Sequence, residues 1–405
     1  MVLLQQHRTW HCADATDNLR VVVAAGGTGG HVFPGLAIAA AIERRLPSAI
    51  VTFSGTPDRL EGRLVPASGY ELDTTPMAPF PRRLDHRALA FPARFLRSVI
   101  QARRQLRARR AHIVIGVGGY PSVPAVVAAW TLRIPILVHE SNAAPGLANM
   151  LAGRLARHVA CAFDPARTGL VHRAEVRQVG IPIMPALAEC DRAAMRAAAR
   201  AQFNVQPDDF FVVVSGGSLG AAVLDRAAAD LACKRSVDDQ LKILIKASAT
   251  HAESLRTRIS DFGGSGVATV VEHIEDMAAA YAAADAVVVR AGACTVAEVQ
   301  HLGVPAVVVP LPGAAGDHQT ANAQGLVRAA SAPVILLRQA ELSAGSLQHA
   351  LNELRRRRGG SAPGPRAAQN PSMLRPTTSP HSGAADAVAD WAIELARTAN
   401  ERAKR

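Results

Sequence analysis

Residues 20–40, RVVVAAGGTGGHVFPGLAIAA, decide the fold. The β-branched apolar run at 20–25 predicts a buried strand, and a helical pattern follows at 33–46. The turn Gly26–His31 between them contains four glycines, which let backbone N–H groups approach a ligand closely. A helix that begins just after such a turn favours bound anions. The stretch therefore predicts a parallel α/β sheet with a phosphate-binding turn, the alternative being a tight turn without a ligand.

The turn matches neither of two common nucleotide-binding motifs. It lacks the Gly-Lys-Ser/Thr of a P-loop, and its third glycine is misplaced for G-x-G-x-x-G. The second predicted strand ends in TFSGT (52–56), without the acid that binds a nicotinamide ribose. The sequence therefore disfavours a dehydrogenase.

The same strand–helix alternation runs through both halves of the chain. The first half predicts strands at 20–25, 49–54, 112–116, 135–139 and 158–163, with helices at 33–46, 57–68, 89–109, 121–131 and 145–156. The second half restarts at FFVVVSGGSLGAAVLDRAAADLA (210–232) and predicts strands at 241–246, 267–271, 286–289 and 305–309. Such alternation indicates parallel sheets whose ligands bind beyond the carboxyl ends of the strands.

The domain organisation follows from these patterns. We expect a disordered tail at 1–19, an N-terminal domain at 20–180, a C-terminal domain at 181–354, a flexible linker at 355–383 and a final helix at 384–400. The proline-containing stretch 179–194 is the expected hinge between two facing domains.

Composition narrows the classes of protein. The 405 residues are 49% hydrophobic, and the five cysteines are scattered without a CxxC pair, which favours reduced thiols over a disulfide framework or zinc site. We expect no membrane-spanning helix. The net charge is +12, and residues 82–110 carry ten arginines against one acid. That block predicts an anionic partner: nucleic acid, a membrane surface or a phosphorylated substrate.

Two further glycine turns follow predicted strands, GVGGYPSVPA at 116–125 and SGGSLGA at 215–221. Three such turns are more specific for phosphate binding than one. His31 lies where a helix is expected to begin, and the helix dipole disfavours its imidazolium form. A neutral His31 beside a bound phosphate would suit proton abstraction from a hydroxyl, the alternative being a histidine that packs or caps the turn.

These motifs together resemble a known family. GGTGGHVFPGLAIA, GVGGYPSVPA, VHESNAAPGLANMLAGRLA, SGGSLGA, EHIEDMAAAYAAADAVVVRAGACTVAEVQHLGVPAVVVPLP and DHQTANA occur in the order found in the bacterial MurG family. Its members are the UDP-N-acetylglucosamine–N-acetylmuramyl-(pentapeptide) pyrophosphoryl-undecaprenol N-acetylglucosamine transferases of glycosyltransferase family 28. The resemblance covers roughly residues 20–345 and fits the final helix.

The resemblance implies a GT-B fold, in which two Rossmann-like parallel-sheet domains are separated by a deep cleft. It implies inverting transfer of GlcNAc from UDP-GlcNAc to the 4-hydroxyl of the muramyl sugar of lipid I, giving lipid II in peptidoglycan synthesis. It implies no cofactor and no protein-bound metal.

The resemblance also assigns residues to the acceptor side. Gly27, Gly29 and Gly30 would hold the acceptor pyrophosphate, with Tyr120 close by. His31 would be the catalytic base or would orient the nucleophile. Thr28 would donate a hydrogen bond from the turn and is counted with the UDP-GlcNAc site.

The donor side is assigned by the same resemblance. Ser218 would contact the nucleotide, the backbone of Ile274 the uracil, and Glu298 both ribose hydroxyls. Small residues after strand 286–289 would bring backbone N–H groups to the UDP diphosphate, with positive charge nearby from Arg290; these residues are Gly292, Ala293, Cys294 and Thr295. Asn142 would face the transferred sugar, while Gln319 and Asn322 would bind its hydroxyls.

In the family, the region corresponding to 76–110 is an apolar patch ringed by basic residues. The resemblance therefore implies docking on an anionic membrane surface and a peripheral location at the cytoplasmic face of the bacterial cell membrane. No nucleic-acid motif accompanies the basic block, so a nucleic-acid partner is not expected.

The chain departs from the family pattern at four positions: Ile181, Met184, Leu219 and His273. These departures leave open a related GT-B UDP-sugar glycosyltransferase with a different acceptor. A membrane-bound binding protein without turnover is a third alternative.

Overall fold

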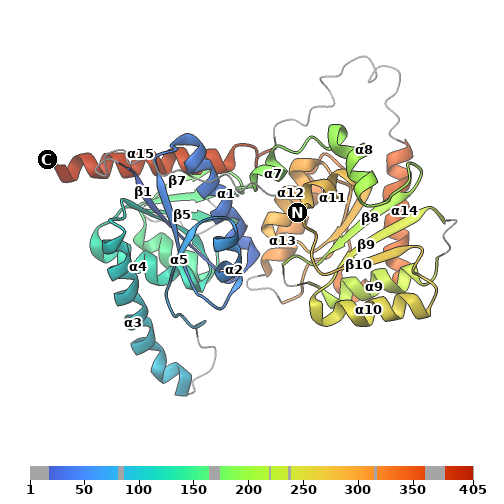
Figure 1. Cartoon of the computed structure of the whole chain (residues 1–405), viewed down its shortest axis with the longest axis horizontal. Coiled ribbons are helices and arrows are strands. Elements are labelled where there is room, and N and C mark those ends of the chain that lie inside the picture. Colours follow the sequence, from blue (N-terminus) through green and yellow to red (C-terminus); the bar gives the residue numbers. More distant parts are fainter. Residues whose placement is uncertain are drawn as a thin grey trace, which may run out of the picture.

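The computed structural model of the protein describes residues 18–80, 86–163, 174–218, 220–235, 239–313, 317–360 and 379–404. They form two α/β domains that face each other, each built on a parallel sheet (Figure 1). The predicted fold class is confirmed. None of the helices in these ranges combines the length and apolar character needed to cross a membrane.

The N-terminal domain contains a seven-stranded sheet in the order β3-β2-β1-β4-β5-β6-β7. Its elements are β1 (Arg20–Ala25), α1 (Gly29–Arg45), β2 (Ile50–Gly55), α2 (Leu60–Ala67), β3 (Glu71–Thr74), α3 (His86–Ala108), β4 (Ile113–Gly118), the 3₁₀ helix η1 (Tyr120–Ser122), α4 (Val123–Leu132), β5 (Ile136–Glu140), α5 (Leu147–Leu155), β6 (His158–Cys161) and β7 (Glu175–Gln178).

The C-terminal domain contains a six-stranded sheet in the order β10-β9-β8-β11-β12-β13. Its elements are α7 (Pro185–Ala188), α8 (Arg192–Gln202), β8 (Phe210–Ser215), α9 (Ala222–Ala232), β9 (Leu241–Lys246), α10 (Ala249–Asp261), β10 (Ala268–Val271), α11 (Met277–Ala283), β11 (Ala286–Val289), α12 (Ala293–Leu302), β12 (Ala306–Val308), α13 (His318–Ala329), β13 (Val334–Leu336), η4 (Gln339–Glu341) and α14 (Ala344–Gly360).

In both sheets the strand order reverses beside the first strand of the domain. β1 pairs with β2 on one side and β4 on the other, and β8 pairs with β9 and β11. In doubly wound sheets, ligands bind at the carboxyl ends of the strands at such a reversal. All three predicted glycine turns lie at these two points.

The valine-rich strands build the cores, and a long helix ties the domains together. α15 (Ala384–Lys404) follows the C-terminal domain in sequence but crosses back to pack on α1 (Figure 1). Its Trp391 is buried in the N-terminal core and carries the Arg177 guanidinium 4.1 Å from its ring centroid. The final helix therefore belongs to the first domain by packing.

The crossing lies against the predicted hinge. The backbone N–H of Ile181 donates to His381 Nδ1 (3.1 Å), and His381 Nε2 is 3.1 Å from Gln300 Oε1 on α12. Gly180 has φ +86°, and a Cβ there would lie 2.1 Å from the Pro380 carbonyl oxygen. Both interdomain connections are thus held at one place.

Two of the predicted boundaries need correction. Of the predicted tail 1–19, residue Leu19 is buried in the core. The predicted linker 355–383 is wrong at both ends: residues 379–383 are held at the hinge with Ser379 and His381 buried, and residues 355–360 continue α14. There Arg355 stacks over Phe210 at 5.6 Å and Arg357 pairs with Glu353, so the arginine run forms a helix surface. The rest of that segment up to residue 378 lies outside the described residues.

Three strands were not predicted. β3, β7 and β13 are short, and most of their residues are only half-buried or are exposed. β3 and β7 therefore lack the continuous apolar run of a central strand, and β13 is apolar but only three residues long.

An arginine–aspartate cluster fixes the helices that carry the C-terminal site. Asp285 is 3% exposed and accepts from Arg196 Nη2 (2.5 Å), Arg200 Nη1 (3.1 Å) and the Phe211 backbone N–H. Arg192 on the same helix, α8, donates to the carbonyls of Tyr281, Ala284, Leu302 and Gly303. α8 thereby clamps the ends of α11 and α12.

We predict that Asp285→Ala lowers the free energy of unfolding by about 3 kcal/mol, because it leaves the guanidinium groups of Arg196 and Arg200 without their acidic partner. Urea unfolding at 25 °C measures the change. Asp261→Ala, at an exposed position on α10, is the matched control. Equal unfolding midpoints for the two variants would contradict the role of the cluster.

Candidate active site between the two domains

The first glycine turn leaves β1 and opens α1. Gly27 has φ +87°, which favours glycine, and Thr28 is the extended residue before the helix. The backbone N–H of Gly27 donates to Glu61 Oε2 (2.9 Å). Glu61 also accepts from Thr56 N (3.1 Å) and Thr56 Oγ1 (2.6 Å). A buried carboxylate thus holds the turn through a hydrogen bond.

His31 lies between this turn and the turn after β4. A Cβ at Gly118 would be 2.7 Å from the imidazole Cδ2, and one at Gly119 would be 3.3 Å from Nδ1. Both glycines have positive φ, so the second turn allows close approach to the ring. Thr28 Oγ1 lies 3.2 Å from His31 Nδ1.

The surroundings keep His31 neutral. Its pKa is lowered to about 4, mainly by desolvation and also by His318 of the other domain, while a hydrogen bond to the Gly26 carbonyl and the charge of Glu61 oppose the lowering. The sequence predicted a neutral ring from the helix dipole, whereas burial is the larger cause. A neutral imidazole that donates from one nitrogen keeps a lone pair on the other, so it can accept a proton.

The loop after β5 is organised by Glu140. This buried carboxylate accepts from Asn142 N (2.8 Å), Asn142 Nδ2 (3.1 Å), Gly146 N (3.3 Å) and Asn149 Nδ2 (2.9 Å). The predicted sugar-facing residue Asn142 is therefore held by its neighbour. His139 Nε2 lies 3.0 Å from the Gly180 carbonyl oxygen, so the loop also contacts the hinge.

Tyr120 begins the 3₁₀ helix beside the first turn. Its hydroxyl accepts from Arg59 Nε (3.2 Å), and its Cε1 would lie 3.8 Å from a Cβ at Gly27. The structure therefore brings the predicted acceptor residues Gly27, Tyr120 and His31 together.

The C-terminal domain meets this turn with a glycine turn of its own. Ser218, after β8, is exposed, and its Oγ would lie 3.1 Å from a Cβ at Gly29. Lys246 Nζ donates to the Gly217 carbonyl (2.9 Å) and holds the turn. Leu219 lies outside the described residues.

A second contact joins the helices α1 and α12. Cys294 Sγ lies 3.7 Å from the Gly30 carbonyl oxygen. Pro34 has no N–H to occupy that carbonyl in the helix, which explains why it is available. Gly292 is the N-cap of α12 and has no side-chain cap, so the first-turn N–H groups of Ala293, Cys294 and Thr295 remain for a ligand.

Glu298 lies one turn further along α12. Tyr281, buried on α11, donates to Glu298 Oε2 (2.9 Å). Desolvation raises the pKa of Glu298 to about 7, and the hydrogen bond from Tyr281 opposes that rise. The carboxylate is therefore oriented, and it is costly to ionise.

Three other predicted donor residues point into the protein. Arg290 is 8% exposed and donates to the carbonyls of Val309 and Pro310 and to Gln339 Oε1. Asn322 is fully buried and donates to the Ala291 carbonyl (3.2 Å). Ile274 is buried in the core, which leaves its backbone for recognition. Arg290 and Asn322 thus shape the loop after β11 from behind.

The side-chain amides of Asn322 and Gln319 differ in their hydrogen bonding. Within the described residues, Asn322 Oδ1 is buried and accepts no hydrogen bond. Gln319 Oε1 accepts from the Leu311 backbone N–H (2.9 Å), which fixes the start of α13. A buried unpartnered oxygen beside a ligand loop is a feature that a bound hydroxyl could satisfy.

Sequence reasoning missed Glu61 and Tyr281. Glu61 lies in the predicted helix 57–68, where an exposed acid is the ordinary interpretation, and Tyr281 lies in an alanine-rich stretch, where a core aromatic is the ordinary interpretation. The short stretch TFSGT before Glu61 was the available signal, since it shows that a second strand ends there in small residues.

Three of the four departures from the family pattern lie within the described residues. Ile181 is fully buried in the C-terminal core and Met184 packs partly against the N-terminal core. His273 is exposed. The first two therefore belong to the hinge packing.

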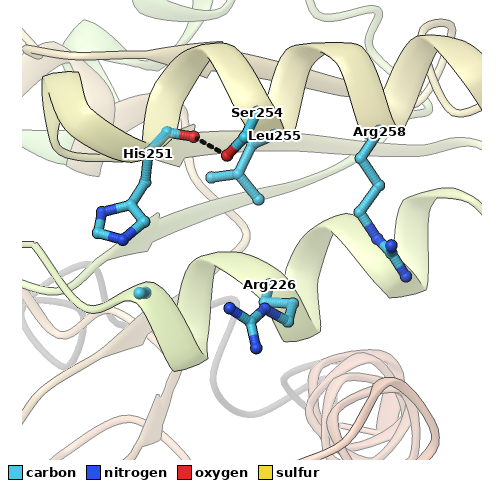
Figure 2. Close-up of a pocket in the computed structure, with 6 residues that line it drawn as sticks. Arg226, His251, Ser254, Leu255 and Arg258 are labelled. Atoms are coloured by element: carbon cyan, nitrogen blue, oxygen red, sulfur yellow. Dashed lines mark hydrogen bonds between the residues drawn. The ribbon is translucent and has the colours of Figure 1, made fainter.

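A separate pocket lies on the outer helices of the C-terminal domain. It has a volume of about 240 Å³ between α9 and α10 and is lined by Ala222, Arg226, His251, Ser254, Leu255 and Arg258 (Figure 2). Arg258 pairs with Asp230 (2.7 Å), and Ser254 Oγ donates to the His251 carbonyl. The side chains of Ser254 and Arg258 thus already bind groups of the protein, and we place the chemistry between the domains instead. Within the described residues, no cluster of three or more His, Cys, Asp or Glu side chains could hold a metal ion.

Comparison with known proteins gives the same relatives along most of the chain. Residues 21–161 match the glycosyltransferase family 28 N-terminal domain, and residues 211–373 match the glycosyltransferase family 28 C-terminal domain. The chain is 42% identical over 334 residues to the UDP-N-acetylglucosamine--N-acetylmuramyl-(pentapeptide) pyrophosphoryl-undecaprenol N-acetylglucosamine transferase of Paenarthrobacter aurescens, covering 81% of this chain and 86% of that one.

Two more relatives agree. The protein of the same name from Bifidobacterium longum is 42% identical over 329 residues, covering 76% of this chain and 83% of that one. The crystal structure of Acinetobacter baumannii MurG has a TM-score of 0.62 at 27% identity, covering 93% of this chain and 99% of that chain.

The raised pKa of Glu298 predicts a cost in stability. Because the folded chain holds this proton up to about pH 7, against a usual value of 4.5, the favourable protonated form is lost as the pH rises through 7. Glu298→Gln should therefore raise the free energy of unfolding by about 2 kcal/mol at pH 8 and leave it unchanged near pH 4.5. Urea unfolding at both pH values measures this, with the exposed Glu341→Gln as control. A loss of stability at pH 8 would contradict the assignment.

Proposed function

The chain belongs to glycosyltransferase family 28, and from that membership we propose that it transfers N-acetylglucosamine from UDP-N-acetylglucosamine to undecaprenyl-linked lipid I. The acceptor group is the 4-hydroxyl of the muramyl sugar, and the product is lipid II of peptidoglycan synthesis. The protein is a hexosyltransferase of the GT-B fold.

The observation that carries the proposal is the meeting of the two glycine turns. His31 and its turn reach the domain boundary from one sheet, and Ser218 with the start of α12 reaches it from the other. An acceptor hydroxyl beside His31 would then face a nucleotide diphosphate at the start of α12. This is the arrangement that transfer between two bound substrates requires.

On the acceptor side, the turn residues Gly29 and Gly30 would hold the pyrophosphate through backbone N–H groups, with the Thr28 hydroxyl as a further donor. His31 would accept the proton of the 4-hydroxyl as its oxygen attacks the anomeric carbon. A bound pyrophosphate would raise the low pKa of His31 and make the ring a stronger base.

On the donor side, the bond between the anomeric carbon and the phosphate oxygen breaks, and UDP leaves. The N-terminus of α12 would stabilise the negative charge that develops on UDP. Glu298, oriented by Tyr281, would accept hydrogen bonds from the ribose hydroxyls. Gln319 and Asn142 would contact the transferred sugar, and Asn322 would close the site from behind.

A membrane-facing surface would bring the enzyme to its lipid acceptor. α3 extends away from the body of the N-terminal domain (Figure 1). Leu89, Leu96 and Ile100 lie along one face of this helix and are exposed by 86%, 59% and 44%. The same helix also carries exposed arginines at positions 94, 97, 104 and 107. Such a surface suits an anionic bilayer at the cytoplasmic side, with apolar side chains entering the lipid.

The acceptor is tested by competition among candidates. Transfer of labelled GlcNAc from UDP-GlcNAc should proceed with a short-chain lipid I analogue. It should not proceed with undecaprenyl monophosphate or with small aglycones. Transfer to an aglycone in preference to the lipid I analogue would support the alternative, a related UDP-sugar glycosyltransferase with another acceptor.

We predict that His31→Ala lowers turnover by about 100-fold, because it removes the group that accepts the proton. Its UDP affinity, measured by calorimetry, should not change, because the nucleotide binds the other domain. His349→Ala, an exposed histidine on α14, serves as the control. Wild-type turnover in the His31 variant would exclude the role.

We predict that replacing Arg97, Arg104 and Arg107 with Glu weakens binding to anionic vesicles by at least about 100-fold, since each basic residue near the surface contributes about 1 kcal/mol. Co-sedimentation with phosphatidylglycerol vesicles measures it. Glu at the exposed positions Arg328, Arg356 and Arg357 gives the same change of charge on the other domain. Equal losses in both triple variants would refute a specific docking face.

A further inference from the structure

One carboxylate is buried beside the first glycine turn, in a position where a charged side chain is costly in free energy. Glu61 is in the first turn of α2 and is 0% exposed. A buried carboxylate is tolerated when its oxygens are hydrogen-bonded or paired with a cation. All three recorded donors to Glu61 are neutral: the backbone N–H groups of Gly27 and Thr56, and the Thr56 hydroxyl.

The two oxygens of Glu61 bind two different strand ends. Oε2 accepts from Gly27, in the turn after β1, and Oε1 accepts from Thr56, directly after β2. The side chain therefore bridges the carboxyl ends of two neighbouring strands. It fixes the glycine turn to the end of the neighbouring strand.

The chain has made room for this carboxylate. A Cβ at Gly26 would lie 2.4 Å from Glu61 Oε1, and a Cβ at Gly55 would lie 2.8 Å from Glu61 Cγ. Neither glycine has a positive φ, so neither is explained by the backbone conformation. Space for the Glu61 side chain explains both.

Gly26 and Gly27 connect Glu61 to His31. A Cβ at Gly119 would lie 2.1 Å from the Gly26 carbonyl oxygen and 3.3 Å from His31 Nδ1, so this carbonyl lies beside the imidazole ring. The next N–H, that of Gly27, donates to Glu61. One rigid peptide unit thus lies between carboxylate and imidazole. We propose that Glu61 is a positioning residue that orients His31 for the transfer reaction, a role that rests on the proposed function.

Glu61→Gln tests the proposal. The amide keeps the size of the side chain, but its NH₂ group would face a donor, so one of the two strand ends is released. We expect turnover with the lipid I analogue to fall by about 10-fold or more, with unchanged UDP affinity. Glu43→Gln is the matched control, because Glu43 is a half-buried carboxylate of the same domain that accepts from Tyr70 Oη.

The double variant separates positioning from damage to the fold. If Glu61 acts through His31, Glu61→Gln should lower the residual activity of His31→Ala by less than about twofold. An equal loss in both backgrounds would show a merely structural role and overturn the proposal, as would wild-type turnover in Glu61→Gln alone. Absence of transfer by the wild-type chain would overturn the proposed function, and this role with it.

Discussion

The close approach of two glycine turns, one from each domain, is the constraint on which the structure depends. A Cβ at Gly29 would lie 3.1 Å from Ser218 Oγ, and the Gly30 carbonyl lies 3.7 Å from Cys294 Sγ. The N-termini of α1 and α12 meet there, and both ends carry positive partial charge. Bound phosphates would offset that repulsion. Larger side chains at these positions would force the two sheets apart.

Several buried polar groups surround the turns, and each lowers the stability of the fold. His31 and His139 are held neutral by burial, and Glu298 is hard to ionise at neutral pH. Asn149 and Asn322 each hold a buried carbonyl oxygen without a partner among the described residues. Such features lower stability and cluster at functional sites. The arginines of α8 and the crossing at His381 supply the rigidity that tolerates them.

The sequence predicts much of this because its strongest signals are local. The apolar β-branched runs predict the central strands. The glycine turns predict a site between the two domains. Contacts between distant residues could not be read in the same way. Arg290 was predicted to supply positive charge near the diphosphate, and the sequence did not show that its guanidinium binds the carbonyls of Val309 and Pro310. Glu61 was not predicted as a site residue, because the stretch TFSGT before it shows where a strand ends but not that Glu61 contacts the turn after β1.

The linkage formed in the product tests the account most directly. UDP-GlcNAc carries an α-linked sugar, and attack from a hydroxyl held by the opposite domain displaces UDP from the other face. Proton NMR of the product made from UDP-GlcNAc and a short-chain lipid I analogue should show a β-linked GlcNAc on the muramyl 4-oxygen. An α linkage, a bond to another oxygen, or no product would contradict a reaction across the two glycine turns.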